Sequence, residues 1–317
     1  MTRYALARLG EVLGVMLAVS FLVYLVLEHN VADVAVKVLG QFSTAEQRTM
    51  WLHENGYDAP FLQRYLVWLG HFVTGRWGSS THFREEVIVL LPPYLRQTGI
   101  LAGLTFAVML SLSFSLGIAA GVREGSLADR FISFTSVFST SVPEFASAVF
   151  LSAVFVFWLG ILPGASTMTS GFAWREIILP VMVLVLYDFG YVARIVRASM
   201  AEVMTQPYVR TALMKGASPA RIILRHALRN ALVAPITVVM LQIPWLLSGV
   251  IVVEVFFAYK GFGTLLYQAC LNSDVALIEA CAMVSVIVIV ATQLFSDLLY
   301  ALLNPRFQLT STRVAVA

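Results

Sequence analysis

Long apolar stretches without charged residues constrain this chain more than any other feature of its sequence. Six of them reach or approach the roughly 20 residues that an α-helix needs to cross the hydrocarbon core of a bilayer. They lie near residues 9–29, between Arg96 and Arg123, and at about 132–160, 177–197, 229–254 and 280–303. The sequence therefore predicts an all-α integral membrane protein with six spanning helices.

The composition agrees with lipid as the surrounding medium. Of the 317 residues, 59% are hydrophobic and 12% are charged, whereas soluble domains carry roughly 25% charged residues. A net charge of +3 does not supply the basic stripe that nucleic-acid binding needs, so no nucleic-acid partner is expected. Cys270 and Cys281 have neither metal-binding nor disulfide spacing and are predicted to pack as apolar residues. The dispersed histidines predict no metal site.

The distribution of basic residues predicts the orientation, because short cytoplasmic loops collect Lys and Arg. If the N-terminus is cytoplasmic, the inner side holds Arg3, Arg8, Arg123, Arg130, Arg194, Arg197, Arg210, Lys215, Arg221, Arg225, Arg229, Arg306 and Arg313. The short outer loops then hold only Arg175 and Lys260. Both termini are therefore predicted to be cytoplasmic.

The same pattern divides the chain into four parts. We expect an uncleaved N-terminal anchor helix at 1–30, an extracytoplasmic segment at 31–97, a five-helix core at 98–306 and a cytoplasmic tail at 307–317. In the extracytoplasmic segment, Trp51, Trp68 and Trp77 among polar residues predict short helices on the membrane surface. The core contains a cytoplasmic loop at 198–230.

Turn-forming residues punctuate this cytoplasmic loop. Pro207 is suited to the first position of a helix, Gly216 to a left-handed helix end, and Ser218 with Pro219 to the start of a second helix. Arg221, Arg225 and Arg229 follow at four-residue intervals and are predicted to share one face. This basic face suits anionic lipid headgroups. A short capped helix on a membrane domain also suits the groove of a partner that transmits motion.

These residues resemble the permease subunits of ATP-driven, binding-protein-dependent importers of the peptide/nickel type. The resemblance rests on Tyr208-Val209-Arg210-Thr211-Ala212, Lys215-Gly216 and Arg225-His226-Ala227-Leu228-Arg229-Asn230-Ala231-Leu232, with further matches at Asn55-Gly56-Tyr57, Gly75-Arg76-Trp77-Gly78, Glu254-Val255-Phe256-Phe257 and Asn304-Pro305-Arg306. Two departures stand out. Arg210 and Thr211 replace the Glu-Ala of the broader permease signature, and Asn30-Val31-Ala32-Asp33 replaces the usual Pro-Gly-Asp-Pro after the first span.

The resemblance implies a type I (MetI-like) importer permease fold in the bacterial inner membrane, surrounded by lipid. It implies that a coupling helix contacts the ATPase through Tyr208, Arg210, Thr211, Ala212, Lys215, Gly216, Ser218, Arg221 and Arg225. It also implies a second homologous permease, two ATP-binding subunits that hold ATP and Mg, and an extracytoplasmic substrate-binding protein. No Gly-x-x-x-x-Gly-Lys-Ser/Thr loop occurs, so this chain is expected to carry no cofactor and no ATPase activity.

Polar groups inside spans are candidates for the translocation pathway, because they are costly in lipid. Asp188 lies near mid-span, and Glu144, Gln242 and Ser248 also lie within predicted spans. Two alternatives remain open for Asp188, namely pairing with Arg194 or with a partner permease. Glu144 could instead bond freed backbone groups or a loop arginine, while Glu254 and Asp297 could reach headgroups.

Two rival functions remain open at the level of sequence. An ion-driven transporter or channel would show inverted repeats or broken spans, and neither is evident. An intramembrane enzyme would need a nucleophile, base or metal set, yet no HExxH or GxSxG motif occurs. The preferred prediction is a permease for a small polar solute, with peptide ahead of a nickel complex, a glutathione-like compound or an oligosaccharide.

Overall fold

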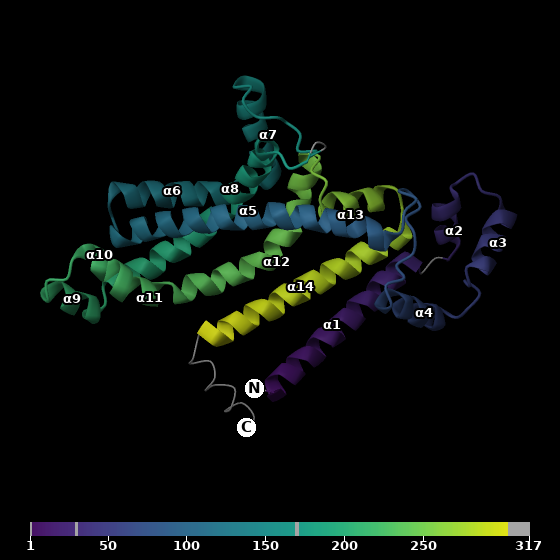
Figure 1. The fold of residues 1–317 in the computed structure, drawn as a ribbon, viewed down its shortest axis with the longest axis horizontal. Coiled ribbons are helices and arrows are strands. Elements are labelled where there is room, and N and C mark those ends of the chain that lie inside the picture. The colour runs from purple at the N-terminus through teal and green to yellow at the C-terminus, as the bar shows by residue number, and fades with distance from the viewer. Residues whose placement is uncertain (1, 29–30, 169–170, 304–317) are drawn as a thin grey trace. The chain divides into compact units, whose positions relative to one another are not determined.

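The computed structural model describes residues 2–28, 31–168 and 171–303, with side chains for all of these except 2–9, 31–33, 37, 244–249 and 297–303. Within these ranges the regular structure is helical (Figure 1), with one isolated antiparallel bridge between Ser79 and Glu86. The first helices are α1 (Thr2–Glu28), α2 (Val31–Leu39), α3 (Ala45–Glu54), α4 (Phe61–Val73), α5 (Val87–Val122), α6 (Leu127–Ser141) and α7 (Glu144–Ser152). The π-helix η1 (Ala153–Trp158) and α8 (Trp174–Met204) follow.

The remaining helices begin at a short helix-turn-helix. They are α9 (Pro207–Met214), α10 (Pro219–Arg221), the π-helix η2 (Ile222–Ala227), α11 (Leu228–Ala231), α12 (Val233–Phe256), α13 (Phe262–Leu271) and α14 (Val275–Leu303). The all-helical fold class predicted from the sequence is thus confirmed for the described residues. The predicted short helices after the first span are also present, as α2, α3 and α4.

Four helices are long and apolar enough to cross a membrane. They are Gly10–Glu28, Val87–Val122, Trp174–Met204 and Val275–Ser296. Two further helix pairs qualify together but are bent at a short break. The described residues therefore provide four spans, or up to six if each bent pair crosses the membrane once.

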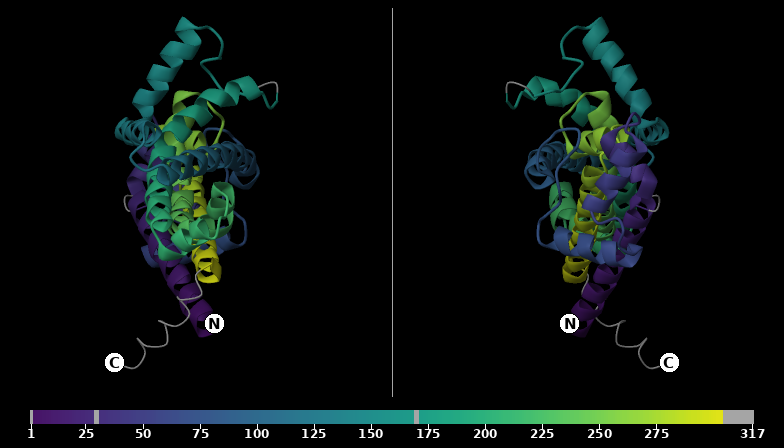
Figure 2. Two further views of the ribbon diagram at one scale, coloured as in Figure 1. Left: turned by 90° about the vertical axis from the view of Figure 1, so that its left-hand side faces the viewer. Right: turned by 90° about the vertical axis from the view of Figure 1, so that its right-hand side faces the viewer.

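The apolar stretch predicted as a span at about 132–160 is not one continuous helix, because the chain bends by 104° between Leu127–Ser141 and Glu144–Trp158. The bend falls at Val142, whose backbone is extended at φ −93° and ψ 124°. Pro143 is the cause, since a proline ring disfavours helical geometry in the preceding residue and provides no amide donor. Figure 2 shows α7 rising away from the line of α6.

A second break interrupts the start of the span predicted at 229–254. Pro219–Ala231 and Val233–Ile243 meet at 54°, on either side of Leu232. The expectation of unbroken spans is therefore corrected here as well. The second predicted span, between Arg96 and Arg123, lies within α5, a helix of 36 residues that begins at Val87.

Two compact units divide the chain, and each is described by itself. The first comprises the described residues of Met1–Thr98 and Lys260–Ala291, and the second those of Gly99–Tyr259 and Thr292–Ala317. In the first unit, buried residues of α5, α13 and α14 form one core: Val87, Leu90, Leu91, Leu265, Ala269, Leu277, Ala280, Cys281 and Val284. Cys281 thus packs as predicted, whereas Cys270 is exposed.

A buried aspartate holds the first unit's loop to the start of α14. The carboxylate of Asp274 accepts hydrogen bonds from the Ser80 hydroxyl, from the His82 amide at 3.2 Å and from the Leu277 amide at 3.3 Å. The Leu277 bond satisfies one of the free amides at a helix start. Asp274 therefore caps α14 and fixes the loop between α4 and α5 with one side chain.

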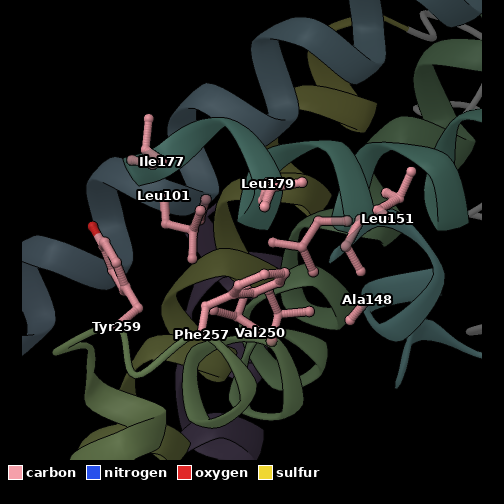
Figure 3. Packing of buried hydrophobic residues seen from close by; sticks show 12 residues of the cluster. Leu101, Ala148, Leu151, Ile177, Leu179, Val250, Phe257 and Tyr259 are labelled. Atoms are coloured by element: carbon pink, nitrogen blue, oxygen red, sulfur yellow. The ribbon is translucent and has the colours of Figure 1, made fainter. Parts of the chain in front are cut away.

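The second unit is organised around α8, which contacts α6, α7, α11 and α12. Its principal core gathers buried residues from α5, α7, α8, α12 and the segment after α12 (Figure 3), including Leu101, Ala148, Leu151, Ile177, Leu179, Val250, Phe257 and Tyr259. Membrane helices can approach closely where small residues lie at their contacts. The packing of these helices against α8 also brings together polar residues that are far apart in the sequence.

Candidate functional site

The helix-turn-helix after α8 forms a compact projection, which we call the knob (residues 207–231). Pro207 occupies the first turn of α9, as predicted. Gly216 adopts φ +75°, and two hydrogen bonds close the helix end, from the Gly216 amide to Leu213 O at 3.0 Å and from the Ala217 amide to Ala212 O at 3.2 Å. This pair of bonds is the Schellman arrangement. The predicted left-handed helix end is therefore confirmed.

A small apolar core fixes the knob's shape. Val209, Ala212 and Ile222 are buried against one another, with Met204 and Ala217 packed around them. Two polar contacts add to this core. The side-chain Nδ2 of Asn230 donates to Tyr208 Oη at 3.0 Å, and the Ser199 hydroxyl of α8 donates to Ala231 O at 2.7 Å. The knob is thus tied internally and to α8.

The second half of the knob departs from the predicted regular helix. Only α10 and α11 are α-helical, and six residues between them form the π-helix η2. Because π-helical bonding joins residues five apart, the four-residue spacing of the arginines does not place them in one straight row. Arg221, Arg225 and Arg229 are nevertheless all exposed. Ser218 stands at the N-cap position, but its side chain makes no capping hydrogen bond.

The knob's outer surface combines basic and apolar side chains. Of the nine residues predicted to contact the ATPase, Ala212 is buried and the others are exposed: Tyr208, Arg210, Thr211, Lys215, Gly216, Ser218, Arg221 and Arg225. Leu213 and Met214 were not among the predicted residues but are also exposed, Met214 at 81%. Met214 follows buried Val209 by five residues and so lies on the other side of α9, which was a signal available in the sequence.

Three of the four predicted pathway residues have described side chains in the second unit, and two of them are in contact. Asp188 of α8 is only 2% exposed, and Gln242 of α12 donates to its Oδ1 at 3.4 Å. Glu144, at the start of α7, lies within electrostatic range of Asp188. The side chain of Ser248 lies outside the described residues. We call Asp188, Gln242 and Glu144 the polar cluster.

The polar cluster has unused hydrogen-bonding capacity. Among the described residues, Asp188 Oδ2 is buried without a hydrogen-bond partner. The alternative pairing of Asp188 with Arg194 is wrong, because Arg194 Nε instead donates to Gly190 O at 3.3 Å. Glu144 forms no ion pair with a loop arginine in the described part of the chain. Two acidic groups and an amide can therefore offer acceptors to a polar or cationic solute.

Of the other two carboxylates in predicted spans, Glu254 and Asp297, only Glu254 has a described side chain. Glu254 is completely buried, so the expectation that it reaches lipid headgroups is wrong. Its backbone oxygen accepts from the Tyr259 amide at 2.8 Å. The side chain of Asp297 lies outside the described residues, so the prediction for that residue is not addressed.

A charged cluster near the knob end of α8 was missed at the level of sequence. Arg197 donates to both carboxylate oxygens of Asp129, from Nε at 2.9 Å and from Nη2 at 2.8 Å, and Nη2 also reaches Glu124 at 3.3 Å. Asp129 is buried at the start of α6, where Ser126 caps the helix. The Ser-x-x-Asp spacing was a signal for the cap, but nothing local indicated its arginine partner.

The structure combines apolar spans, a buried polar cluster and an exposed helical knob. These features define a polytopic α-helical membrane protein. The chain belongs to the family described as binding-protein-dependent transport system inner membrane components, whose sequence profile matches residues 113–309. The matched range includes both the knob and the polar cluster. The family match confirms the resemblance noted from the sequence.

Similar proteins extend over nearly the whole chain. The oligopeptide transport system permease protein AppB of Bacillus subtilis is 30% identical over 319 residues, covering 97% of this chain and 100% of AppB. The di/tripeptide transport system permease protein DppB of Pseudomonas aeruginosa is 30% identical over 337 residues, covering 97% and 99%. A relative from Brucella abortus is 32% identical over 310 residues, covering 96% and 99%.

Family membership establishes the general role of the chain. It is the permease component of a binding-protein-dependent transport system in the inner membrane, and it is a transport subunit rather than an enzyme. Such a component works with ATP-binding cassette proteins and with a substrate-binding protein. The ion-driven transporter and the intramembrane enzyme are thereby set aside.

Proposed function

We propose that the chain forms half of the translocation pathway of an ATP-driven importer of short peptides. The relatives named above are permeases of oligopeptide and di/tripeptide transport, and their similarity extends over almost the full length. In this proposal a second homologous permease forms the other half, and two ATP-binding subunits hold ATP and Mg. The substrate-binding protein delivers the peptide from the extracytoplasmic side.

The observation that carries this proposal is the geometry of the knob. A helix closed by Gly216 and held by its own apolar core presents basic and apolar side chains outward. Such a body moves as a unit, because its core and its bond to α8 resist local deformation. The knob is therefore suited to sit in a groove of the ATP-binding subunit and to transmit its motion to α8.

The proposal includes a topology of six spans with both termini in the cytoplasm. It counts each bent helix pair as one span and places residues 31–97 outside. The basic residues of the knob support this orientation, because positive charges concentrate in short cytoplasmic loops. The exposed arginines would then lie where both anionic headgroups and an ATP-binding subunit are available.

The polar cluster is proposed to line the pathway. Asp188 retains an unsatisfied carboxylate oxygen among the described residues, and a buried acceptor of this kind is costly unless a partner is provided. The amino terminus or a polar side chain of a passing peptide provides such a partner. Gln242 orients Asp188 from the neighbouring helix, and Glu144 adds a second acidic group.

Site-specific cross-linking tests the knob's role. In a background carrying Cys270→Ser and Cys281→Ala, cysteine introduced at exposed Lys215 should cross-link to the ATP-binding subunit of the purified complex. Cysteine introduced at Thr49, which is also exposed but lies on α3, serves as the matched control and should not. An intact complex in which position 215 never reaches the ATP-binding subunit, with or without nucleotide, would contradict the proposal.

A further inference from the structure

A cavity of about 680 Å³ lies wholly within the first unit. The knob and the polar cluster both belong to the second unit. The walls of the cavity come from the end of α1, from α2 to α4, from the loop after α4 and from the first turns of α14. Ligand pockets for small molecules have volumes of about 300–1,000 Å³. The cavity is therefore large enough for a small organic molecule.

Aromatic rings form much of the cavity wall. Trp68 lies between Tyr24 and Phe72, with ring centroids 5.2 Å and 5.9 Å away, and Phe72 stacks on Trp77 at 5.2 Å. Trp51 and Tyr57 line the same cavity. Because the rings of Trp68, Phe72 and Trp77 are stacked on one another, they form a continuous aromatic wall. Such a wall suits the apolar part of a small organic molecule.

A buried carboxylate completes the cavity. Glu279 lines it from α14, is only 6% exposed, and has its Oε1 without a hydrogen-bond partner among the described residues. Trp68 is its hydrogen-bonding neighbour. A buried carboxylate oxygen without a partner is costly. Glu279 therefore has an acceptor available for a donor that enters the cavity.

The neighbouring charged groups are already committed to one another. Glu28 accepts a hydrogen bond from Tyr57 Oη at 2.7 Å and from Arg64 Nη1 at 3.0 Å. Burial, and next the hydrogen bond to Glu28, raise the pKa of Tyr57, so its hydroxyl keeps its proton and continues to donate. The guanidinium of Arg64 also lies over the Tyr57 ring, 4.9 Å from its centroid. This arrangement neutralises Glu28.

Glu279 lies within electrostatic range of Glu28. Arg64 forms its ion pair with Glu28, so the carboxyl group of Glu279 has no ion-pair partner among the described residues. Arg76 also lines the cavity but is exposed, so its guanidinium can remain in solvent. A cation in the cavity would donate to Glu279 Oε1 and supply the ion-pair partner that this carboxyl group lacks.

We propose that this cavity binds the ammonium group of a small amine, with Glu279 as the hydrogen-bond acceptor and the ring of Trp68 beside it. Two sources share this chemistry, a free amine and the amino terminus of a short peptide. The site is independent of the proposed import function, because it requires neither ATP nor the motion of the knob.

Equilibrium binding to the membrane complex in lipid nanodiscs, without ATP and without the binding protein, tests the site. Radiolabelled 2-phenylethylammonium should bind, and its neutral isostere 2-phenylethanol should bind at least about tenfold more weakly, because the charge-assisted hydrogen bond is lost. Glu279→Gln should weaken amine binding by a similar factor. Glu54→Gln, an exposed change in α3 of the same unit, should leave it unchanged.

The dipeptide Phe-Ala and its N-acetylated form distinguish the two sources. Binding of Phe-Ala but not of N-acetyl-Phe-Ala assigns the site to peptide termini, and binding of 2-phenylethylammonium assigns it to free amines. The proposal is overturned if neither amine binds, or if the amine binds the wild type and Glu279→Gln equally. Should Glu279→Gln fail to assemble, equal binding of the amine and the alcohol to the wild type overturns it as well.

Discussion

A single residue, Asp188, combines the features expected of a pathway group. It is buried in α8, accepts one long hydrogen bond from Gln242, and has a second oxygen without a partner in the described structure. Burial alone would favour an apolar residue at this position. The retained carboxyl group is therefore more consistent with a role in contacting solute than with stabilising the fold.

Replacing Asp188 by asparagine keeps its shape and removes its charge. We expect Asp188→Asn to lower peptide uptake by about tenfold, because a charge-assisted hydrogen bond to the solute is lost. Assembly should not suffer, since a buried unpaired carboxylate is also removed. Uptake of labelled dipeptide by proteoliposomes containing the whole transporter measures the change.

The matched control for this substitution is Asp58→Asn, which makes the same chemical change at an exposed position. It should leave uptake unchanged. If Asp188→Asn transports at the wild-type rate while the complex remains intact, Asp188 does not contact solute in the pathway.

At the scale of elements, the close approach of α6 and α8 depends on one glycine. A Cβ atom at Gly190 would lie 2.2 Å from Ser136 O and 2.3 Å from Ser139 Oγ. Both distances are far below van der Waals contact, and the backbone oxygen cannot rotate away. The two helices can therefore pack at this distance only because residue 190 has no side chain.

Gly190→Ala should destabilise the chain by about 1–3 kcal/mol or more, the usual effect of overpacking. The measurement is thermal unfolding of the detergent-solubilised protein, followed by tryptophan fluorescence. Gly99→Ala is the matched control in α5, where a Cβ would meet nothing within 4 Å. This control should be neutral or slightly stabilising, because alanine favours helix. An unchanged midpoint for Gly190→Ala would show that α6 and α8 are not held at this separation.

The knob permits a second prediction at this scale. Gly216→Ala places a side chain at φ +75°, which costs about 1–2 kcal/mol for an L-residue, and it should loosen the closed end of α9. Gly216→Asn should be milder, since asparagine tolerates this conformation. We expect the alanine variant to hydrolyse more ATP per peptide imported than the asparagine variant. Equal ratios in the reconstituted transporter would contradict a coupling role for this turn.

Local chemistry explains which elements could be predicted from the sequence. Pro207 and Gly216 determine the ends of α9 through their own backbone preferences, so the knob followed from a few adjacent residues. The bend at Pro143 has the same kind of local cause. Because apolar residues continue on both sides of Pro143, however, residues 132–160 were interpreted as one span. The π-helix η2 has no such local signal, because it arises where the knob packs against itself and α8.

Contacts between distant residues could not be predicted in this way. Gln242 and Asp188 are 54 positions apart, and their meeting depends on how α8 and α12 pack. The sequence identified both as polar residues in apolar surroundings but contained nothing that paired them. The same holds for Arg197 and Asp129, and for the cavity beside Glu279, which forms only when α1, α4 and α14 come together.

For the whole molecule, the number of membrane crossings depends on the bent pair α6 and α7. The predicted topology needs this pair to cross once, because only then do three spans separate α3 from the knob. If the pair instead enters and leaves on one side, only α5 and α8 separate them, and both lie on the same face of the membrane. The bend of 104° is compatible with either arrangement by geometry alone. Charge favours a crossing, because Arg123 lies just before the pair and Arg130 near its start, whereas only Arg175 follows it before α8 becomes apolar.

Labelling of single cysteines distinguishes these two topologies. In the background of Cys270→Ser and Cys281→Ala, Thr49→Cys and Lys215→Cys place exposed thiols on α3 and on the knob. A membrane-impermeant maleimide added to intact spheroplasts should label position 49, whereas position 215 should react only after the membrane is permeabilised. Labelling of both positions from the outside would mean that α6 and α7 do not cross. It would also place the knob outside the cytoplasm, where it cannot contact an ATP-binding subunit. This one experiment therefore tests both the topology and the coupling mechanism.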